Sequence, residues 1–324
     1  MSDLPNRISI KEEGPREGFQ IESAAIPTER KVALIDALSG TGLRKIQIVS
    51  FVNPRRVPGM ADADDVVRTF RKAEGVDYYA LWLNLQGFER ALVHRARLAV
   101  RGTLQTCASE AFLRRNQNRN LAQNEAYQRH VADAYRNAGV PVDRGSVMAA
   151  FGCNFEGDIA PATVLRMVDL IFAVAAENAF QIDEIALADT MGWATPRSIK
   201  RVVGAVRDRY PDARINLHLH DTRGMGIANA YAGLEMGVDS FDASVAGLGG
   251  CPFAAHPGAS GNVCTEDLVF MCEEMGIETG VDLGALIEAA HLARDIVGHS
   301  LPGHLMQGGK LSALRQARKA VAGG

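Results

Sequence analysis

The chain has 324 residues, of which 47% are hydrophobic and 23% are charged, and its formal net charge is −3. This length and apolar content suffice for one large core, and the balanced charge argues against a nucleic-acid-binding protein. The sequence shows neither an apolar run long enough to span a membrane nor a signal-peptide pattern at its start, so we expect a cytoplasmic protein that binds neither nucleic acid nor membranes.

Eight short apolar runs predict β-strands, and helical patterns separate many of them. In chain order, the predicted strands span residues 7–12, 43–50, 76–83, 98–104, 145–151, 182–189, 214–221 and 238–245. Amphipathic helices are predicted at residues 27–39, 122–138, 162–177, 195–210 and 228–236. Two further helices are predicted after the eighth strand, at residues 281–297 and 310–321.

This alternation of strands and helices predicts a parallel sheet, because parallel neighbours need a crossover between them. Eight such units over this length is the number found in a (β/α)8 TIM barrel. The alternative is an open doubly wound sheet, but the segment "EEGPREGFQ" after the first strand lacks the glycine fingerprint of that fold. We therefore predict one catalytic TIM-barrel domain over residues 1–324, with residues from about 281 onward forming additional helices packed on the barrel.

Polar residues gather at the predicted carboxyl ends of the strands, where TIM barrels carry their active sites. They are Arg16, Glu17 and Gln20 at the end of the first strand, Gln47 and Ser50 in the second, Asp189 at the end of the sixth, and His218, His220 and Asp221 in the seventh. We expect these side chains to converge on one site.

The seventh strand carries His218 and His220, which project to the same face because they are two residues apart. Two imidazoles inside a barrel suit a divalent metal when a carboxylate and a carbonyl oxygen complete the ligands. Glu17 and Asn262 are the available oxygens, since strands one and eight lie beside strand seven in a closed barrel. A hydrogen-bonded pair of core histidines is the alternative, but the polar neighbours favour a site for Mg²⁺ or Mn²⁺.

The five cysteines contain no C-x-x-C pair, which is typical of a reduced, cytosolic protein. Four of them lie in apolar or helical segments and are predicted to be buried: Cys107, Cys153, Cys264 and Cys272. Cys251 instead follows Gly249 and Gly250 in a glycine-rich loop, where it is either a small turn residue or an accessible thiol that acts as an acid or base.

Seven segments together resemble the hydroxymethylglutaryl-CoA lyases, which are metal-dependent barrel enzymes related to Claisen-type synthases. These segments are "GPREGFQIE", "SFVNPRRVPGM", "NLQGFE", "ADTMGWATP", "LHLHDTRGMGIANA", "SVAGLGGCPFA" and "GASGNVCTEDLVFM". The resemblance implies that the chain cleaves a 3-hydroxyacyl-CoA thioester, either hydroxymethylglutaryl-CoA or a close analogue, into an acyl-CoA and a keto acid. It also implies a role in leucine degradation and a homo-oligomeric state, which we expect to be a dimer.

The resemblance assigns roles to individual residues. Catalytic roles fall on Arg16, Gln20, Asp189, Cys251, Glu266 and Asp267, substrate contacts on Arg16, Gln47 and Asn84, and metal ligation on Glu17, His218, His220 and Asn262. In this chemistry Arg16 would meet the negative charge that develops on the thioester oxygen. Cys251 would then protonate the enolate.

Three departures from the family pattern predict a preferred substrate that differs from hydroxymethylglutaryl-CoA in its acyl substituents. The lyases have Asp where this chain has Glu17, and Glu where it has Gln47. Trp82 replaces part of a small or proline-containing stretch, and it would add bulk if it faced the mouth of the barrel. Two other functions stay open, a Claisen-type synthase, which the cysteine loop disfavours, and a non-catalytic barrel that binds CoA esters.

Overall fold

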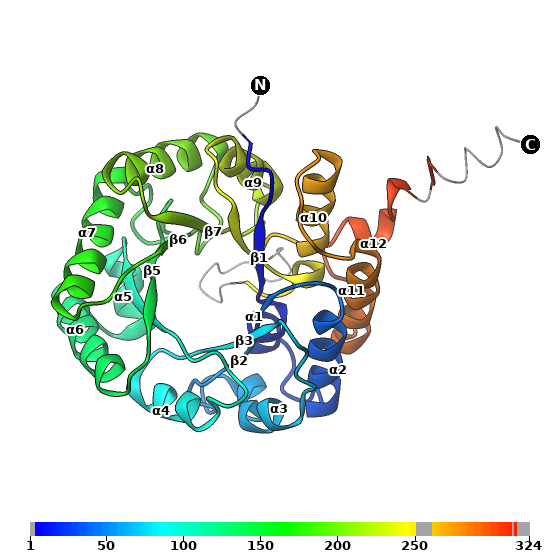
Figure 1. Ribbon diagram of the computed structural model, residues 1–324, viewed down its shortest axis with the longest axis horizontal. Helices are drawn as coiled ribbons and strands as arrows, with labels where there is room; N and C mark the ends of the chain where they lie inside the picture. The colour runs from blue at the N-terminus through cyan, green and yellow to red at the C-terminus, as the bar shows by residue number, and fades with distance from the viewer. Residues whose placement is uncertain (1–3, 251–260, 313, 316–324) are drawn as a thin grey trace, which may run out of the picture.

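The computed structural model describes residues 4–250, 261–312, 314 and 315, and it shows a ring of strands enclosed by helices (Figure 1). The strands are β1 (Ser9–Glu12), β2 (Lys45–Ser50), β3 (Asp77–Leu81), β4 (Gly102–Cys107), β5 (Val142–Met148), β6 (Glu184–Ala188), β7 (Arg214–His218) and β8 (Ser240–Ala243). Each of the eight predicted apolar runs overlaps one of these strands. The largest shifts in position occur at β4 and β5.

The helices surround this ring on its outer side (Figure 1). They are α1 (Gly14–Ile21), α2 (Thr28–Ser39), α3 (Ala63–Thr69), α4 (Leu85–Val93), α5 (Glu110–Gln117), α6 (Leu121–Asn137), α7 (Pro161–Glu177), α8 (Pro196–Arg209), α9 (Gly226–Glu235), α10 (Thr265–Glu274), α11 (Leu283–Val297) and α12 (Leu305–Gly308), with short 3-10 helices η1 (Pro58–Met60) and η2 (Val245–Gly247). The predictions are confirmed for α2, α6, α7, α8, α9 and α11. Residues 311, 312, 314 and 315 of the last predicted helix are also helical, and the rest of it, up to residue 321, lies outside the described residues.

The strands pair in the order β3-β2-β1-β8-β7-β6-β5-β4, and every paired neighbour is parallel. The two ends of this curled sheet meet, since the N–H of Ala99, just before β4, donates to the carbonyl of Tyr78 in β3 at 2.8 Å. The predicted TIM barrel is therefore confirmed. Its closure places β1, β8 and β7 side by side, as the proposed meeting of their end residues requires.

The alternation of side chains in β7 explains how the site is positioned. Leu217 is fully buried against the helix layer, where its Cδ1 atom lies 2.5 Å from the point that a Cβ atom on Gly233 of α9 would occupy. Only glycine therefore allows α9 to pack this closely. Asn216 and His218 project to the opposite face, into the barrel, because neighbouring residues of a strand alternate in direction.

Ion pairs fill the barrel interior below this end of the strands. Arg144 of β5 lies 2.8 Å from a carboxylate oxygen of Glu184 in β6 and 2.8 Å from one of Asp242 in β8. The Nδ2 atom of Asn216 donates to the other Asp242 oxygen at 3.1 Å. Buried charges need such partners. This layer of ion pairs therefore holds Asp242 in place under the residues at the strand ends.

Helices α11 and α12 lie on the outer side of the barrel (Figure 1). Helix α11 lies against α2 and α10, and α12 lies against α10 and α11. Asp267 of α10 accepts the N–H groups of His304 and Leu305, which fixes the start of α12. Within the described residues, no helix combines the length and apolar character needed to cross a membrane.

Candidate functional site

Arg16, Glu17 and Gln20 were expected at the end of the first strand, but they lie in helix α1. Strand β1 ends at Glu12, and the helix begins two residues later at Gly14. Pro15 suits the first turn of a helix, where its missing N–H is not needed. The periodicity of the sequence did not reveal α1 because eight residues give only about two helical turns. The helix places Gln20 one turn beyond Arg16 and Glu17.

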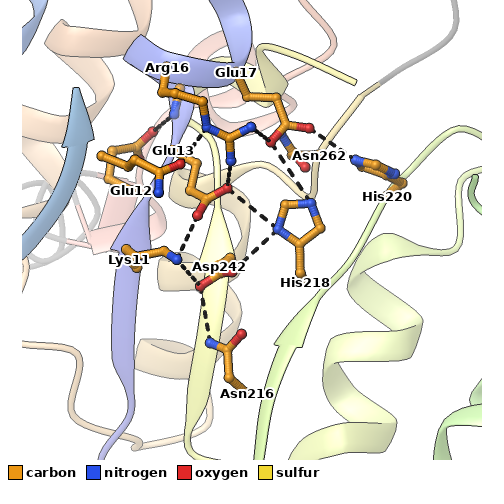
Figure 2. Close-up of polar contacts among 12 residues, drawn as sticks. Lys11, Glu12, Glu13, Arg16, Glu17, Asn216, His218, His220, Asp242 and Asn262 are labelled. Carbon is orange, nitrogen blue, oxygen red and sulfur yellow. Dashed lines mark hydrogen bonds and ion pairs between the residues drawn. The ribbon is translucent and has the colours of Figure 1, made fainter. Parts of the chain in front are cut away.

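Glu17 and two imidazoles converge above the barrel interior (Figure 2). The Nε2 atom of His220 lies 3.3 Å from Oε1 of Glu17, and the Nε2 atom of His218 lies 3.9 Å from Oε2. One ligand atom from each of the three side chains lies within 4.8 Å of the other two. Neighbouring ligands of an octahedral Mg²⁺ are about 3 Å apart, so small side-chain rotations would complete a site. We call Glu17, His218 and His220 the imidazole cluster.

Asn262 joins this cluster from the segment that precedes α10. A backbone bridge pairs it with His220, and its side-chain Nδ2 donates to the carbonyl of Leu248 at 3.3 Å. Its Oδ1 atom is buried and has no hydrogen-bond partner among the described residues, and the same is true of Nδ1 of His220. A buried polar atom without a partner is costly, so Asn262 Oδ1 fits the role of a ligand that awaits a cation. The donor set therefore fits Mg²⁺ or Mn²⁺.

Arg16 is held in place by three side chains. Its Nη1 atom lies 2.9 Å from Oε2 of Glu17, its Nε donates to Oε1 of Gln47, and its Nη2 donates to Oε2 of Glu13. Burial alone would lower the pKa of the guanidinium, but the charges of Glu13 and Glu17 outweigh burial and raise it. Arg16 is thus a fixed cation directly beside the imidazole cluster.

The pKa values of Glu17 and His218 are shifted in opposite directions. Burial opposes ionisation of Glu17, but Arg16 and the two histidines hold the pKa of its carboxyl well below the usual range. Burial likewise opposes protonation of His218, but a hydrogen bond with Asp242 and the charges of Glu17 and Glu13 raise the pKa of its imidazole. The cluster therefore favours positive charge next to Glu17, which a divalent cation would supply.

Three charged residues lie under the cluster, namely Lys11, Glu13 and Asp242. Sequence reasoning placed Glu13 at the end of the first strand without giving it a role, and it missed Lys11 and Asp242. Lys11 Nζ lies 2.7 Å from Glu13 and 3.4 Å from Asp242, and all three side chains are largely buried. A partial signal was available in the sequence, because Lys11 and Glu13 are two residues apart at the end of the first strand. Such a pattern predicts side chains on the same face of the strand.

A buried polar atom without a protein partner is free to contact a substrate. Within the described part of the chain, Gln20 and Asp189 each keep such an atom, and Gln47 does not. Oε1 of Gln20 and Oδ2 of Asp189 are buried without a hydrogen-bond partner among the described residues. The other oxygen of Asp189 accepts the N–H groups of Trp193 and Ala194, at 2.7 and 3.0 Å. Burial raises the pKa of Asp189 despite the opposing charge of His220. Gln47 already pairs with Arg16.

Asn84 and Trp82 are engaged elsewhere. The side chain of Asn84 caps α4 by accepting the N–H of Gly87 at 2.8 Å. Nε1 of Trp82 donates to the hydroxyl of Tyr135 in α6 at 2.8 Å, and its ring packs against Phe88 of α4. Trp82 was expected to add bulk only if it faced the mouth of the barrel, and that condition is not met, since its indole lies between α4 and α6.

Glu266 and Asp267 form the first turn of α10 and contact neighbouring loops instead of the imidazoles. Oε2 of Glu266 accepts the N–H of Ala246 at 3.0 Å, and Asp267 holds the start of α12. Glu12 of β1 acts together with Glu266, because its Oε1 accepts the N–H of Val245 at 2.8 Å. We call Glu12, Glu266 and the Val245–Ala246 backbone the loop-root cluster.

Cys251 lies outside the described residues, but the chain on both sides of its segment is well defined. A Cβ atom on Gly261 would lie 1.5 Å from the carbonyl oxygen of Gly249, so the two ends of the segment are in contact. A Cβ atom on Gly249 would lie 2.8 Å from Cγ of Glu17. The segment that carries Cys251 therefore begins and ends beside the imidazole cluster.

The other four cysteines are buried, as predicted. Burial raises the pKa of Cys107 and of Cys272 to about 12, and it raises the pKa of Cys264 as well. The thiols of Cys107, Cys264 and Cys272 are therefore poor nucleophiles and poor ligands near neutral pH.

Known proteins resemble this chain over nearly its whole length. The sequence matches the HMGL-like family over residues 7–293. It is 43% identical over 292 residues to the mitochondrial hydroxymethylglutaryl-CoA lyase of Rattus norvegicus, which covers 89% of this chain and 85% of the relative. It is 39% identical over 307 residues to the hydroxymethylglutaryl-CoA lyase YngG of Bacillus subtilis, which covers 94% of this chain and 97% of the relative.

Crystal structures agree with these sequence matches. The HMG-CoA lyase of Bacillus subtilis superimposes with a TM-score of 0.86 at 38% identity, covering 94% of this chain and 98% of that chain. An HMG-CoA lyase of Acinetobacter baumannii in complex with coenzyme A and 3-methylmalate gives a TM-score of 0.84 at 37% identity, covering 94% and 96% of the two chains. The chain therefore belongs to the HMGL-like family and is an enzyme of the carbon–carbon lyase class.

Proposed function

We propose that this member of the HMGL-like family uses Mg²⁺ or Mn²⁺ to cleave a 3-hydroxyacyl-CoA thioester into an acyl-CoA and a keto acid. The observation that carries the proposal is the convergence of Glu17, His218 and His220, with Arg16 fixed beside them. The substrate class is supported by relatives named hydroxymethylglutaryl-CoA lyases. A related enzyme has been crystallised with coenzyme A and 3-methylmalate.

Glu17, His218, His220 and Asn262 would hold the cation through one carboxylate, two imidazoles and one amide oxygen. A cation bound there supplies Lewis acidity, which lowers the pKa of the substrate hydroxyl and orients the bond to be broken. Asn262 contributes without adding charge, and its backbone pairing with His220 keeps the two ligands at a fixed distance.

Arg16 stabilises the charge that develops when the carbon–carbon bond breaks. The bonding electrons pass to the thioester fragment as an enolate, while the hydroxyl loses its proton and becomes the carbonyl of the keto acid. Arg16 is already oriented by Glu13, Glu17 and Gln47, so it need not reorganise during the step. Such preorganised donors are usually the largest single contribution to catalysis.

The proton that the substrate hydroxyl loses passes to a base, and we assign that role to Asp189, whose Oδ2 is buried without a hydrogen-bond partner among the described residues. The enolate must then gain a proton, and we assign that transfer to the thiol of Cys251. The assignment is supported by the positions of Gly249 and Gly261, which bring the ends of this segment against the imidazole cluster. Cys251→Ala should lower kcat about 10²–10⁴-fold, the usual contribution of one acid–base group. The thiol should also react with alkylating agents faster than the four buried cysteines, with protection by bound substrate. Turnover near that of the wild type would reject this assignment.

The preferred acyl group depends on Glu17 and Gln47. Glu17 is one methylene longer than the aspartate of the lyases, and a displacement of that size at the site can change rates by about 10²-fold. Gln47 presents a neutral amide beside Arg16, and Gln20 and Asp189 each retain a buried oxygen for a further contact. We propose on these two residues that the best substrate is an analogue of hydroxymethylglutaryl-CoA with different acyl substituents.

A panel of 3-hydroxyacyl-CoA thioesters tests both statements. Cleavage should require Mg²⁺ or Mn²⁺, stop when a chelator is added, and yield an acyl-CoA and a keto acid. A kcat/KM of about 10⁴ M⁻¹s⁻¹ or more with hydroxymethylglutaryl-CoA, the low end for true substrates, would refute the altered substrate preference. Condensation in place of cleavage would indicate a Claisen-type synthase.

The remaining proposals rest on the sequence and on its family resemblance. We propose one catalytic domain over residues 1–324, a homodimer, a cytoplasmic location and a role in leucine degradation. A cytoplasmic relative from Mus musculus and a bacterial relative support the location. Light scattering of the purified protein would give its oligomeric state directly.

A further inference from the structure

The two ring nitrogens of His218 face different groups (Figure 2). Its Nε2 atom points toward Oε2 of Glu17, at 3.9 Å, and so toward the proposed cation. Its Nδ1 atom lies 3.6 Å from Oε2 of Glu13 and 3.4 Å from Oδ2 of Asp242. Two carboxylates therefore surround the side of the ring that does not face the cluster.

Each of these carboxylates contacts an arginine, and both contact Lys11. Asp242 is held from below by Arg144 at 2.8 Å and also lies 3.4 Å from Lys11. Glu13 lies 2.7 Å from Lys11 and accepts from Arg16. The support matters because a buried carboxylate without a cation would gain a proton, and it could then no longer accept freely from an imidazole.

Glu13 differs from Asp242 in one respect. The same oxygen, Oε2, accepts from Nη2 of Arg16 and faces Nδ1 of His218. Asp242 faces His218 but has no contact with Arg16 in the described hydrogen bonds and ion pairs. Glu13 thus joins Arg16 to an imidazole ligand, and it lies outside the proposed ligand set of Glu17, His218, His220 and Asn262. With His218 and Asp242 it forms a second group whose ligand atoms lie within 4.8 Å of one another, but Lys11 already occupies the space between the two carboxylates, at 2.7 Å from Glu13 and 3.4 Å from Asp242.

We propose that Glu13 is a positioning residue for the lyase reaction. Asp242 is the nearer carboxylate to Nδ1 of His218, and the charge of Glu13 acts with it to favour the proton on Nδ1, which leaves Nε2 free to bind the cation. Of the two carboxylates, Glu13 is the one that also holds Arg16 at a fixed distance from that ligand. Metal-binding histidines commonly donate their second N–H to a carboxylate, which fixes the tautomer and the orientation of the ring. This inference rests on the proposed cation site and adds to it the residue that orients it.

A purely structural role for Glu13 predicts different behaviour. If the residue served only as an ion-pair partner for Lys11, its replacement would lower stability and leave the affinity for a cation unchanged. Cation affinity therefore separates the two roles, and it can be measured without substrate.

The decisive variant is Glu13→Gln, which keeps the length of the side chain and one acceptor oxygen but removes its charge. We expect the Kd for Mn²⁺, measured by titration calorimetry on the metal-free protein, to rise about 10–100-fold, the usual effect of losing such a partner. We also expect kcat to fall while KM changes less, because Arg16 loses its orientation. Glu13→Asp keeps the charge but withdraws it, so its Kd should lie between the two.

The matched control is Glu22→Gln. Glu22 also faces a histidine, since its Oε2 lies 2.9 Å from Nε2 of His299, but that pair lies at the surface. This variant should bind Mn²⁺ and turn over as the wild type does. His218→Ala provides the second control, because it should lose Mn²⁺ binding altogether if the proposed site is correct.

The outcomes separate the two proposals. If Glu13→Gln binds Mn²⁺ with wild-type affinity while His218→Ala does not bind it, the inference about Glu13 is wrong and the cation site stands. If His218→Ala binds Mn²⁺ as tightly as the wild type, the proposed cation site is itself wrong, and the role of Glu13 fails with it. Should Glu13→Gln not fold, the Kd of Glu13→Asp decides by the same criterion.

Discussion

Glu12 and Glu13 are neighbours in the chain, yet their carboxylates enter two different environments. Glu13 enters the barrel, where Lys11 and Arg16 surround it beside the imidazole cluster. Glu12 enters the loop-root cluster, where its oxygens accept from the N–H groups of Gly14 and Val245 and from the hydroxyl of Thr265. The first environment supplies cations, and the second supplies neutral donors.

This difference sets the charge of the buried acids. Arg144 and Lys11 overcome burial at Asp242 and hold the pKa of its carboxyl well below the usual range. Burial dominates in the loop-root cluster and raises the pKa of Glu12 and of Glu266 to about 7. Acids of one type thus serve two purposes, because one group provides a permanent charge for the site and the other holds the backbone as partly neutral acceptors.

The loop-root cluster still contributes to the site through the backbone. Its carboxylates accept from the consecutive N–H groups of Val245 and Ala246, and Ala246 adopts a φ of 57°, which is uncommon for a residue other than glycine. The chain then continues through Leu248, whose carbonyl accepts from Asn262, to Gly249 beside Glu17. The loop-root cluster therefore determines where the segment carrying Cys251 begins.

The strongest test of the comparison removes a ligand from the charged region. His220→Ala should lower kcat by at least about 10³-fold, because the Lewis acidity of the cation is worth several kcal/mol. The variant should also lose Mn²⁺ in titration calorimetry while it keeps its fold. His299→Ala, which removes an exposed imidazole, is the control and should behave as the wild type does. Full activity in His220→Ala would remove the basis for a distinct charged region.

The next effect concerns Arg16, the cation beside Glu17. Arg16→Gln should lower kcat about 10²–10³-fold, as is usual when one preorganised donor to a developing oxyanion is lost. KM should change less, because the interaction is made mainly in the transition state. Arg44→Gln, at an exposed arginine that donates to the carbonyl of Gly75, should leave both constants unchanged. A loss that appears in KM alone would show that Arg16 only binds the substrate.

The third test uses pH to separate the two kinds of acid. A pKa that is raised from 4.5 to about 7 means that the stability contributed by Glu12 is complete below pH 4.5 and is lost as the pH rises through 7, an effect of roughly 3 kcal/mol. Relative to the wild type, Glu12→Gln should therefore gain about this much stability between pH 5 and pH 8. Urea unfolding at several pH values measures it.

Asp242→Asn should show the opposite pattern. A lowered pKa means that the stability from Asp242 is present above its ordinary value of 3.8 and is lost only as the pH falls through the lower folded value. Its destabilisation should therefore be constant from about pH 5 to about pH 6 and decrease in stronger acid, and it should not increase as the pH falls from 8 to 5 by more than the His218–Asp242 pair contributes. Parallel curves for Glu12→Gln and Asp242→Asn would contradict the comparison.

The features of this structure that the sequence could predict were those with a regular spacing of residues along the chain. Eight alternating units predicted the barrel. The H-x-H spacing predicted His218 and His220 on one face, and both do face Glu17, although β7 ends at His218 and His220 lies two residues beyond it. Helix α1 was missed because it is short, so the predicted end of the first strand was wrong, although its residues still reached the site. The split between Glu12 and Glu13 could not be predicted, since it depends on partners more than 200 residues away, Val245 for Glu12 and His218 for Glu13.

The smallest expected effect concerns Asp267, an acid that the family resemblance made catalytic. Its Oδ1 accepts the N–H groups of His304 and Leu305, at 3.1 and 2.7 Å, and its Oδ2 lies 2.9 Å from Nδ1 of His304. Asp267→Asn keeps the accepting oxygen, and the new amide can donate to the neutral imidazole. The imidazole is 84% exposed, so its ion pair with Asp267 contributes at most about 1 kcal/mol.

We therefore expect Asp267→Asn to lower the free energy of unfolding by less than about 1 kcal/mol and to change kcat/KM less than about twofold. Asp267→Ala should cost more, about 1–3 kcal/mol, because it leaves buried N–H groups at the start of α12 without an acceptor. If Asp267 transferred a proton in the reaction, the Asn and Ala variants would instead lose activity equally, by about 10²-fold or more. Comparing the two variants thus decides whether Asp267 acts through its charge, as Glu17 does, or by accepting backbone hydrogen bonds, as Glu12 and Glu266 do.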